Sequence, residues 1–532
     1  MNRSDLMARL RQLARASIQT GQAAQGDEAP GSESRRRFTQ GALAAAAAAA
    51  TWSVSPAALA TVGRTVGKIG RLRDASVGIV GAGIAGLACA TELGRMGWYA
   101  QVFEAADRVG GRCASLRGLF PGQVVERGGE FFSRSHHTML GYARELGLSV
   151  ENANIMPGET YFHFGGSRYT EAQVANEYRE FASSMQQDLL WAGSPTADRF
   201  GPHAEALDLM TVDEYLDLRG AGSLLRRLVA SACQAEYGVG LDDLGAMAFL
   251  RVLHGNPRSK FSPYGGDAGE RMRVVGGNDQ IASGLADRLI RPVALQHRLV
   301  SVRRTAAGKV RLVFEAGGGF VERDFQAVVL ALPFSVLRDV EMHTSLNLPS
   351  WKNLAINASA MGNHGRIALG FKSPFWHTNH GLNGTGYTDL PRVQATWEAR
   401  SGNADTAVLA AHVGGEAGLA LGQQGVQADA AAFLAQLEKV MPGASAMASR
   451  DENGQLVAHV ESWSHNPLAK GSYPCNRPGY FTTLAHNEGK AVGNLLFAGD
   501  HTSSIYEWQG FMEGAALSGL RAAAEVHALA QA

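Results

Sequence analysis

Residues 77–112 read VGIVGAGIAGLACATELGRMGWYAQVFEAADRVGGR, and the order of elements in this stretch decides the fold. It predicts a strand, a glycine turn, a helix, a second strand that ends at the acidic Glu104, and a second glycine turn. Gly81, Gly83 and Gly86 have the G-x-G-x-x-G spacing that permits a tight turn, close approach of a pyrophosphate, and packing of helix on strand. The helix N-terminus offers N–H groups and a positive dipole end to phosphates. Because a carboxylate closing the second strand can bind ribose hydroxyls, the stretch predicts a dinucleotide site.

The second glycine turn indicates which dinucleotide binds. Residues 107–112, DRVGGR, do not belong to the minimal NAD fingerprint. Together with Glu104 they form E-x-x-D-R-x-G-G-R, which resembles the flavin amine oxidase superfamily of monoamine, polyamine and L-amino acid oxidases, with the carotenoid desaturases as relatives. The resemblance implies FAD and places Arg112 at its pyrophosphate, where a guanidinium can bind two oxygens. The alternative is a solvated loop arginine.

Composition and cysteine spacing limit the classes of partner. The chain has 532 residues with 49 Lys+Arg and 49 Asp+Glu, so no net charge favours nucleic acid as a partner. Its length allows two domains. The four cysteines have no metal-ligand spacing, and we predict no metal; an oxidising compartment would permit a disulfide, but the sequence does not show which cysteines would pair.

The first sixty residues are typical of an export signal. SRRRFTQ at 34–40 resembles the twin-arginine motif, an Ala-rich apolar run follows from 41 to about 54, and Ala58–Ala60 offers an A-x-A cleavage site. The sequence therefore predicts a signal peptide over 1–60, export by the twin-arginine machinery, and a periplasmic or secreted protein. That route moves folded proteins, so FAD could be inserted before export. A membrane anchor is the alternative, but Ala is weakly apolar and Pro56 interrupts the run.

The motifs fall into separated blocks and predict a discontinuous cofactor domain. We expect an α/β fold: a Rossmann-like FAD-binding domain from 74–150, 271–339 and 470–532, and a mixed α+β substrate-binding domain from 151–270 and 340–469. Branched apolar runs predict strands in the middle block, and helical patterns predict helices in the substrate domain. The strand predictions are 298–303, 310–315 and 325–332, and the helix predictions are 211–218 and 222–235.

The C-terminal block matches the same superfamily independently. NLLFAGDHT at 494–502 predicts a strand that ends at Asp500, and WQGFMEGA at 508–515 opens a helix of small residues. The resemblance implies that Asp500 contacts the ribityl chain, that the turn after Val125 passes the flavin ring, and that adenine lies near Leu299. The residues expected to hold FAD are Gly81, Ala82, Gly83, Ala85, Gly86, Glu104, Ala105, Gly111, Arg112, Gly128, Gly129, Glu130, Phe131, Leu299, Val300, Asp500, Gly510, Phe511 and Met512.

Three aromatic residues are candidates for the substrate site. Trp463 and Tyr473 delimit WSHNPLAKGSY, which is similar to the W-x(n)-G-x-Y stretch of the superfamily. The resemblance implies that Tyr473 and Phe511 flank the substrate nitrogen, where aromatic faces suit a lone pair or a cation. The alternative is that all three are core residues.

Two departures from the superfamily pattern affect the chemistry. Ser472 stands where monoamine oxidases carry the cysteine bound to FAD, so we predict non-covalent FAD. Arg366 stands where the superfamily places a lysine bridged by water to flavin N5, and arginine cannot act as a base near neutral pH. Arg366 could hold that water, bind a substrate carboxylate as Arg117 also could, or be structural.

The resemblance implies an FAD-dependent oxidoreductase with Arg366, Trp463, Tyr473 and Phe511 at its catalytic site. It would remove a hydride from the carbon bearing the nitrogen of an amine or L-amino acid, giving an imine, then a carbonyl with ammonia or an amine, and H2O2 with O2 as acceptor. One alternative is a dehydrogenase or desaturase with another electron acceptor, because Arg366 replaces the lysine. Another is an exported flavin-binding module without catalysis. The sequence leaves a homodimer open.

Overall fold

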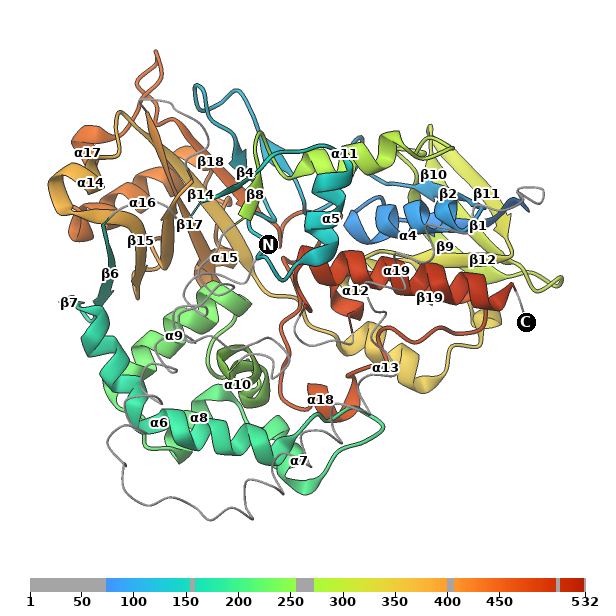
Figure 1. The fold of residues 1–532 in the computed structure, drawn as a ribbon, viewed down its shortest axis with the longest axis horizontal. Coiled ribbons are helices and arrows are strands. Elements are labelled where there is room, and N and C mark those ends of the chain that lie inside the picture. Colours follow the sequence, from blue (N-terminus) through green and yellow to red (C-terminus); the bar gives the residue numbers. More distant parts are fainter. Residues whose placement is uncertain (1–72, 154–157, 255–271, 400–405, 504–507, 531–532) are drawn as a thin grey trace.

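The computed structural model describes residues 73–153, 158–254, 272–399, 406–503 and 508–530. Two bodies of secondary structure lie side by side (Figure 1). One contains a parallel sheet, its helices and a second, mainly antiparallel sheet, and the other contains a large mixed sheet covered by helices. The predicted export signal over 1–60 lies outside the described residues.

A four-stranded parallel sheet forms the core of the first body. Its strands occur in the order β19-β12-β1-β2, and every neighbouring pair is parallel. They come from the beginning, middle and end of the described chain: β1 (Arg73–Val80), β2 (Trp98–Phe103), β12 (Ala327–Leu330) and β19 (Leu495–Phe497). β12 and β19 are buried along their whole length, as expected for strands covered on both faces. The predicted Rossmann-like α/β fold is confirmed.

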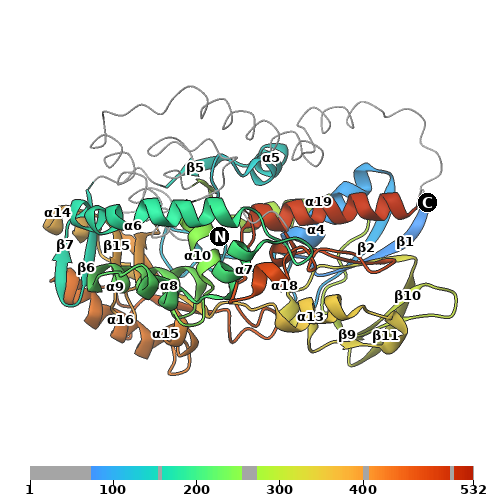
Figure 2. The ribbon, with the colours of Figure 1, turned by 90° about the horizontal axis from the view of Figure 1, so that it is seen from below.

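Two helices from opposite ends of the chain pack together beside this sheet (Figures 1 and 2). α4 (Ile84–Arg95) follows the first glycine turn, and α19 (Met512–Leu529) is the last described helix. Their axes approach closely because small residues face one another. A Cβ on Gly519 would lie 2.3 Å from the carbonyl oxygen of Ala85. The C-terminal block therefore closes the same layer that the opening motif begins.

The second, mainly antiparallel sheet corrects one strand prediction. The predicted strands at 298–303 and 310–315 are confirmed as β9 (Arg298–Arg304) and β10 (Val310–Ala316). The run at 325–332 is divided: β11 (Gly319–Phe325) pairs with β10, and β12 joins the parallel sheet. Sequence reasoning missed β11 because five of its seven residues are exposed and three consecutive charged residues, 322–324, interrupt its apolar ones, which leaves no apolar alternation.

A seven-stranded sheet forms the centre of the second body. Its order is β18 (Ala458–Ser462), β14 (His364–Phe371), β17 (Ala407–Gly414), β16 (Ala395–Glu398), β15 (Leu382–Thr388), β6 (Glu159–Phe164) and β7 (Ser167–Tyr169). β14 lies between β17 and β18, antiparallel to both, and all its residues are buried. α16 (Val426–Val440) packs on β14, and α9 (Ser223–Tyr237) packs on β17.

Helices form the outer layer of the second body. They are α6 (Glu171–Ala192), α7 (Pro202–Leu209), α8 (Val212–Leu218), α9 and α10 (Ala246–His254). Capping boxes at Thr170 and Thr211 start α6 and α8, because each threonine accepts from a backbone N–H three residues later. The helices predicted at 211–218 and 222–235 are confirmed as α8 and α9.

The four cysteines are all buried, and no disulfide joins them. Over the described ranges, no helix combines the length and apolar character needed to span a membrane. The same ranges hold no group of three His, Cys, Asp or Glu side chains arranged to bind a metal ion. The predicted domain boundaries stay a prediction.

Candidate functional site

The first glycine turn leaves the N-terminus of α4 open. Gly81 has φ +103°, and a Cβ on Gly86 would lie 1.9 Å from the carbonyl oxygen of Gly81, so both positions require glycine. Gly83 caps the helix without a side-chain hydrogen bond, and a Cβ built on it would meet nothing within 4 Å. The turn therefore leaves the first N–H groups of α4, including that of Ala85, facing open space, as phosphate binding requires, while the N–H of Ala82 is bonded to Glu104.

Glu104 connects the end of β2 to this turn. Its Oε2 accepts a hydrogen bond from the N–H of Ala82 at 2.8 Å, and its Oε1 accepts one from the N–H of Ala106 at 2.9 Å. Each carboxylate oxygen keeps a lone pair for a further donor. Glu104 and the neighbouring Ala105 thus lie where a ribose beside the glycine turn could be bound.

The second glycine turn packs directly on the first. The N–H of Gly110 donates to the carbonyl oxygen of Ala82 at 2.8 Å, and Gly83 and Gly110 form a β-bridge. A Cβ on Gly111 would lie 3.5 Å from the Cα of Gly83. The two turns, separated in the sequence by a helix and a strand, therefore share one surface.

Arg112 extends from this surface to the C-terminal block. Its guanidinium binds the carboxylate of Asp500 through both terminal nitrogens and also donates to the carbonyl oxygen of Ser472. Burial would raise the pKa of Asp500, but the charge of Arg112 outweighs it and holds the pKa of that carboxyl well below its usual range. Asp500 is thus ionised at neutral pH. The N–H of Gly510 donates to its carbonyl oxygen at 3.4 Å, which places the last turn beside it.

The turn after β4 (Val125–Glu126) lies against Arg112 on its other side. A Cβ on Gly128 would lie 1.9 Å from the carbonyl oxygen of Arg112, and the N–H of Gly129 donates to that oxygen at 3.0 Å. Trp463 covers the turn, and its indole Nε1 donates to the carbonyl oxygen of Arg127 at 3.2 Å. These contacts bring the predicted cofactor segments together.

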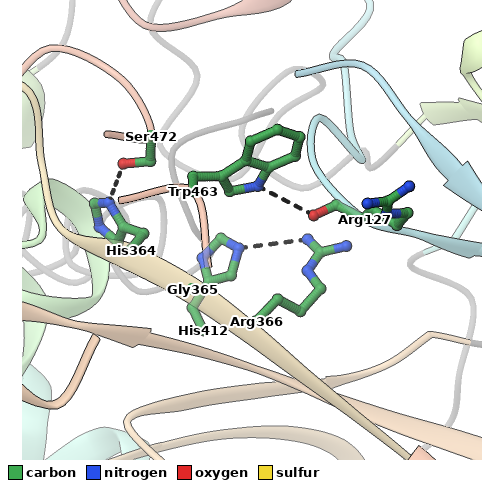
Figure 3. Close-up of a pocket in the computed structure, with 7 residues that line it drawn as sticks. All are labelled: Arg127, His364, Gly365, Arg366, His412, Trp463 and Ser472. Atoms are coloured by element: carbon green, nitrogen blue, oxygen red, sulfur yellow. Dashed lines mark hydrogen bonds between the residues drawn. The ribbon is translucent and has the colours of Figure 1, made fainter. Parts of the chain in front are cut away.

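Tyr473 lies beside two further polar groups. Its ring stacks on His364 with centroids 4.6 Å apart, and its hydroxyl lies 3.3 Å from His364 Nε2. The Oγ of Ser472 lies 2.5 Å from His364 Nδ1 (Figure 3). Burial lowers the pKa of His364 to about 3, so this imidazole is neutral at neutral pH. The strand β14 supplies His364, which therefore holds the ring of a predicted catalytic residue in place.

Phe511 is the N-cap residue of α19 and lies within a second aromatic group. Its ring centroid lies 5.5 Å from that of His136 and 6.1 Å from that of Trp508, in edge-to-face geometry. Met512 is the first helical residue, and both it and Phe511 are buried. Burial lowers the pKa of His136 to about 3. Trp508 was not among the predicted candidates, although it lies within the C-terminal motif that carried them.

Arg366 is held in a buried ion pair. Its Nη1 lies 2.9 Å from Glu130 Oε2, both side chains are 2% exposed, and Nη1 also donates to the carbonyl oxygen of Glu126. Its Nη2 lies 3.4 Å from His412 Nε2, the residue opposite it on β17. The guanidinium carbon lies 5.0 Å from the centroid of the Trp397 ring, and Trp397 also donates to Glu130. These partners fix the guanidinium in position.

A small cavity lies between these groups (Figure 3). Its volume is about 10 Å³, which is room for about one water molecule. It is lined by Arg127, His364, Gly365, Arg366, His412, Trp463 and Ser472. Sequence reasoning missed Arg127 and His412. Arg127 directly follows a predicted strand, but His412 lies in an apolar strand and no local motif marks it.

The predicted adenine residues lie apart from this cavity, on β9. The side chain of Leu299 is buried in the core beneath the mainly antiparallel sheet, beside Phe314 on the neighbouring strand. Only its backbone and the half-buried Val300 are therefore available to a ligand. The adenine contact stays a prediction.

Comparison with known proteins agrees with this geometry. A family model described as flavin containing amine oxidoreductase matches residues 84–527. The chain belongs to this family. It is 29% identical over 470 residues to the Mycobacterium tuberculosis protein assigned as flavin-containing monoamine oxidase AofH, covering 85% of this chain and 96% of that protein. It is 25% identical over 471 residues to pig amine oxidase [flavin-containing] B, covering 85% and 86%.

Solved structures show the same fold. Putrescine oxidase bound to putrescine aligns with a TM-score of 0.72 at 21% identity, covering 85% of this chain and 99% of that one. Cyclohexylamine oxidase from Brevibacterium oxydans aligns with a TM-score of 0.72 at 22% identity, covering 86% and 100%. Family membership implies a flavin cofactor and a small amine substrate. The open face of Gly83 and the uncapped helix beside Arg112 fit such a cofactor.

Proposed function

We propose that this protein is an exported FAD-dependent oxidoreductase that oxidises the C–N bond of an amine. One observation carries the proposal: Arg112 contacts both Asp500 and the backbone of Ser472, next to Tyr473. This contact joins the glycine turns, which suit a dinucleotide, to a buried aromatic site, which suits an amine. A flavin extending from the turns would reach that aromatic site.

The chain's own residues have separate roles toward the cofactor. The N-terminus of α4, Gly111 and Arg112 would hold the pyrophosphate, and Glu104 would hold the adenosine ribose. Asp500 would accept from the ribityl chain because its carboxylate is ionised. Bound FAD supplies the chemistry by accepting a hydride from the carbon that bears the nitrogen. Ser472 offers no thiol, so we propose that FAD is held non-covalently.

The aromatic residues would orient the amine and exclude water. Tyr473 and Phe511 are both buried, and each contacts a buried histidine that is neutral at neutral pH. A neutral surrounding favours the uncharged form of the amine, because burying an unpaired charge is costly. That form carries the lone pair which assists loss of hydride. The product would be an imine, whose hydrolysis gives a carbonyl compound.

Two electron acceptors, O2 and a periplasmic electron carrier, fit the proposed function. The family favours O2, with H2O2 as product. The pairing of Arg366 with Glu130 favours a second acceptor, because the pair has no net charge where the superfamily pattern has a lysine. A positively charged group near the flavin would stabilise negative charge that develops when oxygen is reduced. A periplasmic electron carrier is therefore the alternative.

Anaerobic reduction of the purified yellow holoprotein tests the function. An amine panel should bleach the flavin absorbance, and air should restore it with formation of H2O2. Slow recovery in air that a dye or a cytochrome accelerates would favour the alternative acceptor. Absence of bleaching by any amine or amino acid would contradict the proposed function.

Export is tested separately. Replacing Arg35, Arg36 and Arg37 by lysine should retain the protein in the cytoplasm, while the parent chain should reach the periplasm or the medium. Equal distribution of the two chains would contradict the twin-arginine proposal. Light scattering of the purified protein would show whether it is a monomer or a homodimer.

A further inference from the structure

Ser472 and Tyr473 lie on a segment that runs antiparallel to the residues just before β14. The N–H of Ser472 donates to the carbonyl oxygen of Gly362 at 3.0 Å, and the N–H of Gly362 donates to the carbonyl oxygen of Tyr473 at 2.9 Å. Met361 and Pro474 form a β-bridge in the same pairing. These bonds fix the backbone of Tyr473, whereas the direction of its ring depends on side-chain contacts.

His364, the first residue of β14, contacts both side chains of this segment. Its Nδ1 lies 2.5 Å from the Oγ of Ser472 (Figure 3), and its Nε2 lies 3.3 Å from the hydroxyl of Tyr473. The imidazole also stacks on the Tyr473 ring, with 25° between the two planes. Backbone carbonyl oxygens of Gln234 and Ala235, on α9, face the imidazole as well. The buried imidazole is therefore enclosed between α9 and the segment that carries Tyr473.

The hydrogen bond made by Ser472 determines which imidazole nitrogen carries the proton. The hydroxyl of Ser472 donates to the carbonyl oxygen of Gly362 at 3.0 Å. Because a hydroxyl has one proton, its oxygen then accepts from Nδ1 of His364, and Nδ1 carries the ring proton. Burial lowers the pKa of His364 to about 3, so the imidazole is neutral at neutral pH. Its Nε2 thus keeps a lone pair, which accepts from the Tyr473 hydroxyl.

We propose that His364 is a positioning residue for amine oxidation that acts through the hydroxyl of Tyr473. This inference rests on the proposed function. By accepting the phenolic proton at Nε2, His364 fixes the plane of the aromatic face that would flank the substrate nitrogen. A fixed ring holds the reacting carbon in one orientation, and a small misplacement of reacting atoms lowers the rate strongly. The limiting rate of flavin reduction should therefore depend on His364 more than the affinity for the amine does.

Two amide variants of different length test the inference on the holoprotein. His364→Gln can bring an acceptor oxygen to the place of Nε2, whereas the shorter side chain of His364→Asn reaches only the place of Nδ1. Both variants lose the stacked ring, so the difference between them isolates the contact with Tyr473. The probe is whichever of phenethylamine, benzylamine and putrescine reduces the parent flavin fastest under anaerobic conditions.

The two variants should differ in rate rather than in affinity. We expect the limiting rate of flavin reduction to be about tenfold lower in His364→Asn than in His364→Gln, which is the factor for one lost hydrogen bond. The dissociation constants for the amine should agree within about threefold. Equal limiting rates would overturn the inference.

Removing the hydroxyl of Tyr473 shows whether His364 acts through it. In the Tyr473→Phe background, an acceptor at position 364 no longer has a phenolic proton to accept, so the Asn and Gln variants should reduce flavin at rates within about twofold of each other. A difference that stays near tenfold would overturn the inference, because it would reflect a general effect on the fold. His380→Gln is the matched control and should keep the parent rate. His380 ends α14 (Phe375–His380), where its ring contacts the carbonyl oxygen of Pro442.

The position of the ring proton gives a readout that does not depend on activity. With isotope-labelled histidine, the nitrogen NMR signals of His364 are those that disappear in His364→Gln. We expect a protonated Nδ1 and an unprotonated Nε2 at neutral pH, and a protonated Nε2 would overturn the inference even if no variant folded. A parent protein that amines reduce, but whose Asn and Gln variants have equal rates, loses only this inference. A parent protein that no amine reduces loses the proposed function as well.

Discussion

Arg112 and Asp500 are 388 positions apart in the chain, and in the fold they form a two-pronged ion pair. Arg112 ends the second glycine turn, and Asp500 follows the last strand of the parallel sheet. The Asp500 carboxylate is buried and the Arg112 side chain is one-quarter exposed. The pair therefore joins the two ends of the cofactor segments and fixes a carboxylate and a guanidinium at one point of the site.

Replacing Arg112 by methionine should weaken both folding and flavin binding. Asp500 would lose the charge that keeps its carboxyl ionised. We expect a loss of roughly 2 kcal/mol of stability, below the range for a fully buried pair because Arg112 is partly exposed. The ratio of flavin to protein after gel filtration and the thermal midpoint check this. Arg298→Met, which removes an exposed pair, is the control; equal flavin retention by both variants would contradict the role of Arg112.

Two glycines of the first turn should respond differently to alanine. Gly86→Ala places a Cβ 1.9 Å from a backbone oxygen, so we expect severe loss of folded protein. Gly83→Ala meets no atom within 4 Å and has φ −75°, so apoprotein stability should change by no more than about 0.5 kcal/mol. The new methyl group would instead occupy the space in front of the turn. A flavin dissociation constant raised about tenfold or more, measured by fluorescence, is expected; unchanged affinity in Gly83→Ala would show that the cofactor does not bind there.

Flavin should leave the protein on denaturation. Ser472 replaces the thiol that would attach it, and its hydroxyl donates to the carbonyl oxygen of Gly362 at 3.0 Å. Acid precipitation of the holoprotein should leave all yellow colour in the supernatant. Colour that stays with the precipitated protein would contradict non-covalent binding.

The Arg366–Glu130 pair should show strong coupling. Arg366→Met alone leaves a buried carboxylate without its cation and should cost about 3–5 kcal/mol. The double variant with Glu130→Gln should recover part of that loss, because it removes the stranded charge as well. Urea unfolding of the parent, both single variants and the double variant measures the coupling. Additive losses would show that the pair contributes nothing beyond its separate side chains.

Glu488 should make stability depend on pH. Its carboxyl is buried and accepts from the hydroxyl of Tyr480, which lies on α18 (Tyr480–Thr483). Burial raises its pKa to about 7, from an ordinary value of about 4.3. Between these values the folded protein keeps a proton that the unfolded chain has lost, so this group's contribution to stability falls as pH rises from about 4.3 to 7.

Glu488→Gln removes that titration. The free energy of unfolding of the variant should equal that of the parent near pH 4.5 and exceed it by roughly 2–3 kcal/mol near pH 7. Thermal midpoints between pH 4.5 and 7 measure the difference. The measurement stops at pH 7 because the neighbouring Lys352 begins to titrate there. Lys352 donates to the Glu488 carbonyl oxygen at 2.8 Å, and burial lowers the pKa of Lys352 to about 7. If the thermal midpoints of variant and parent change with pH in parallel, the shifted pKa of Glu488 is contradicted.

Local patterns were sufficient for much of the fold. The G-x-G-x-x-G turn, the acid at Glu104 and the apolar strands predicted the parallel sheet, because each depends on backbone conformation and burial encoded within a few residues. β11 was missed because its exposed side chains leave no apolar pattern. His412 was missed because it is a single polar residue in a buried strand, and its importance depends on the register that places it opposite Arg366.

The sequence by itself determined the fold class, the glycine turns and the residue types available to the site. Only the tertiary structure decided how those residues are paired. The sequence left three roles for Arg366: holding a water, binding a carboxylate, or supporting the structure. A guanidinium can serve all three, and its partner, Glu130, lies on a distant segment of the chain. The same holds for Arg112 with Asp500. Local backbone conformation is determined by neighbouring residues, whereas the charge of a buried site depends on which distant groups the fold brings within a few ångströms.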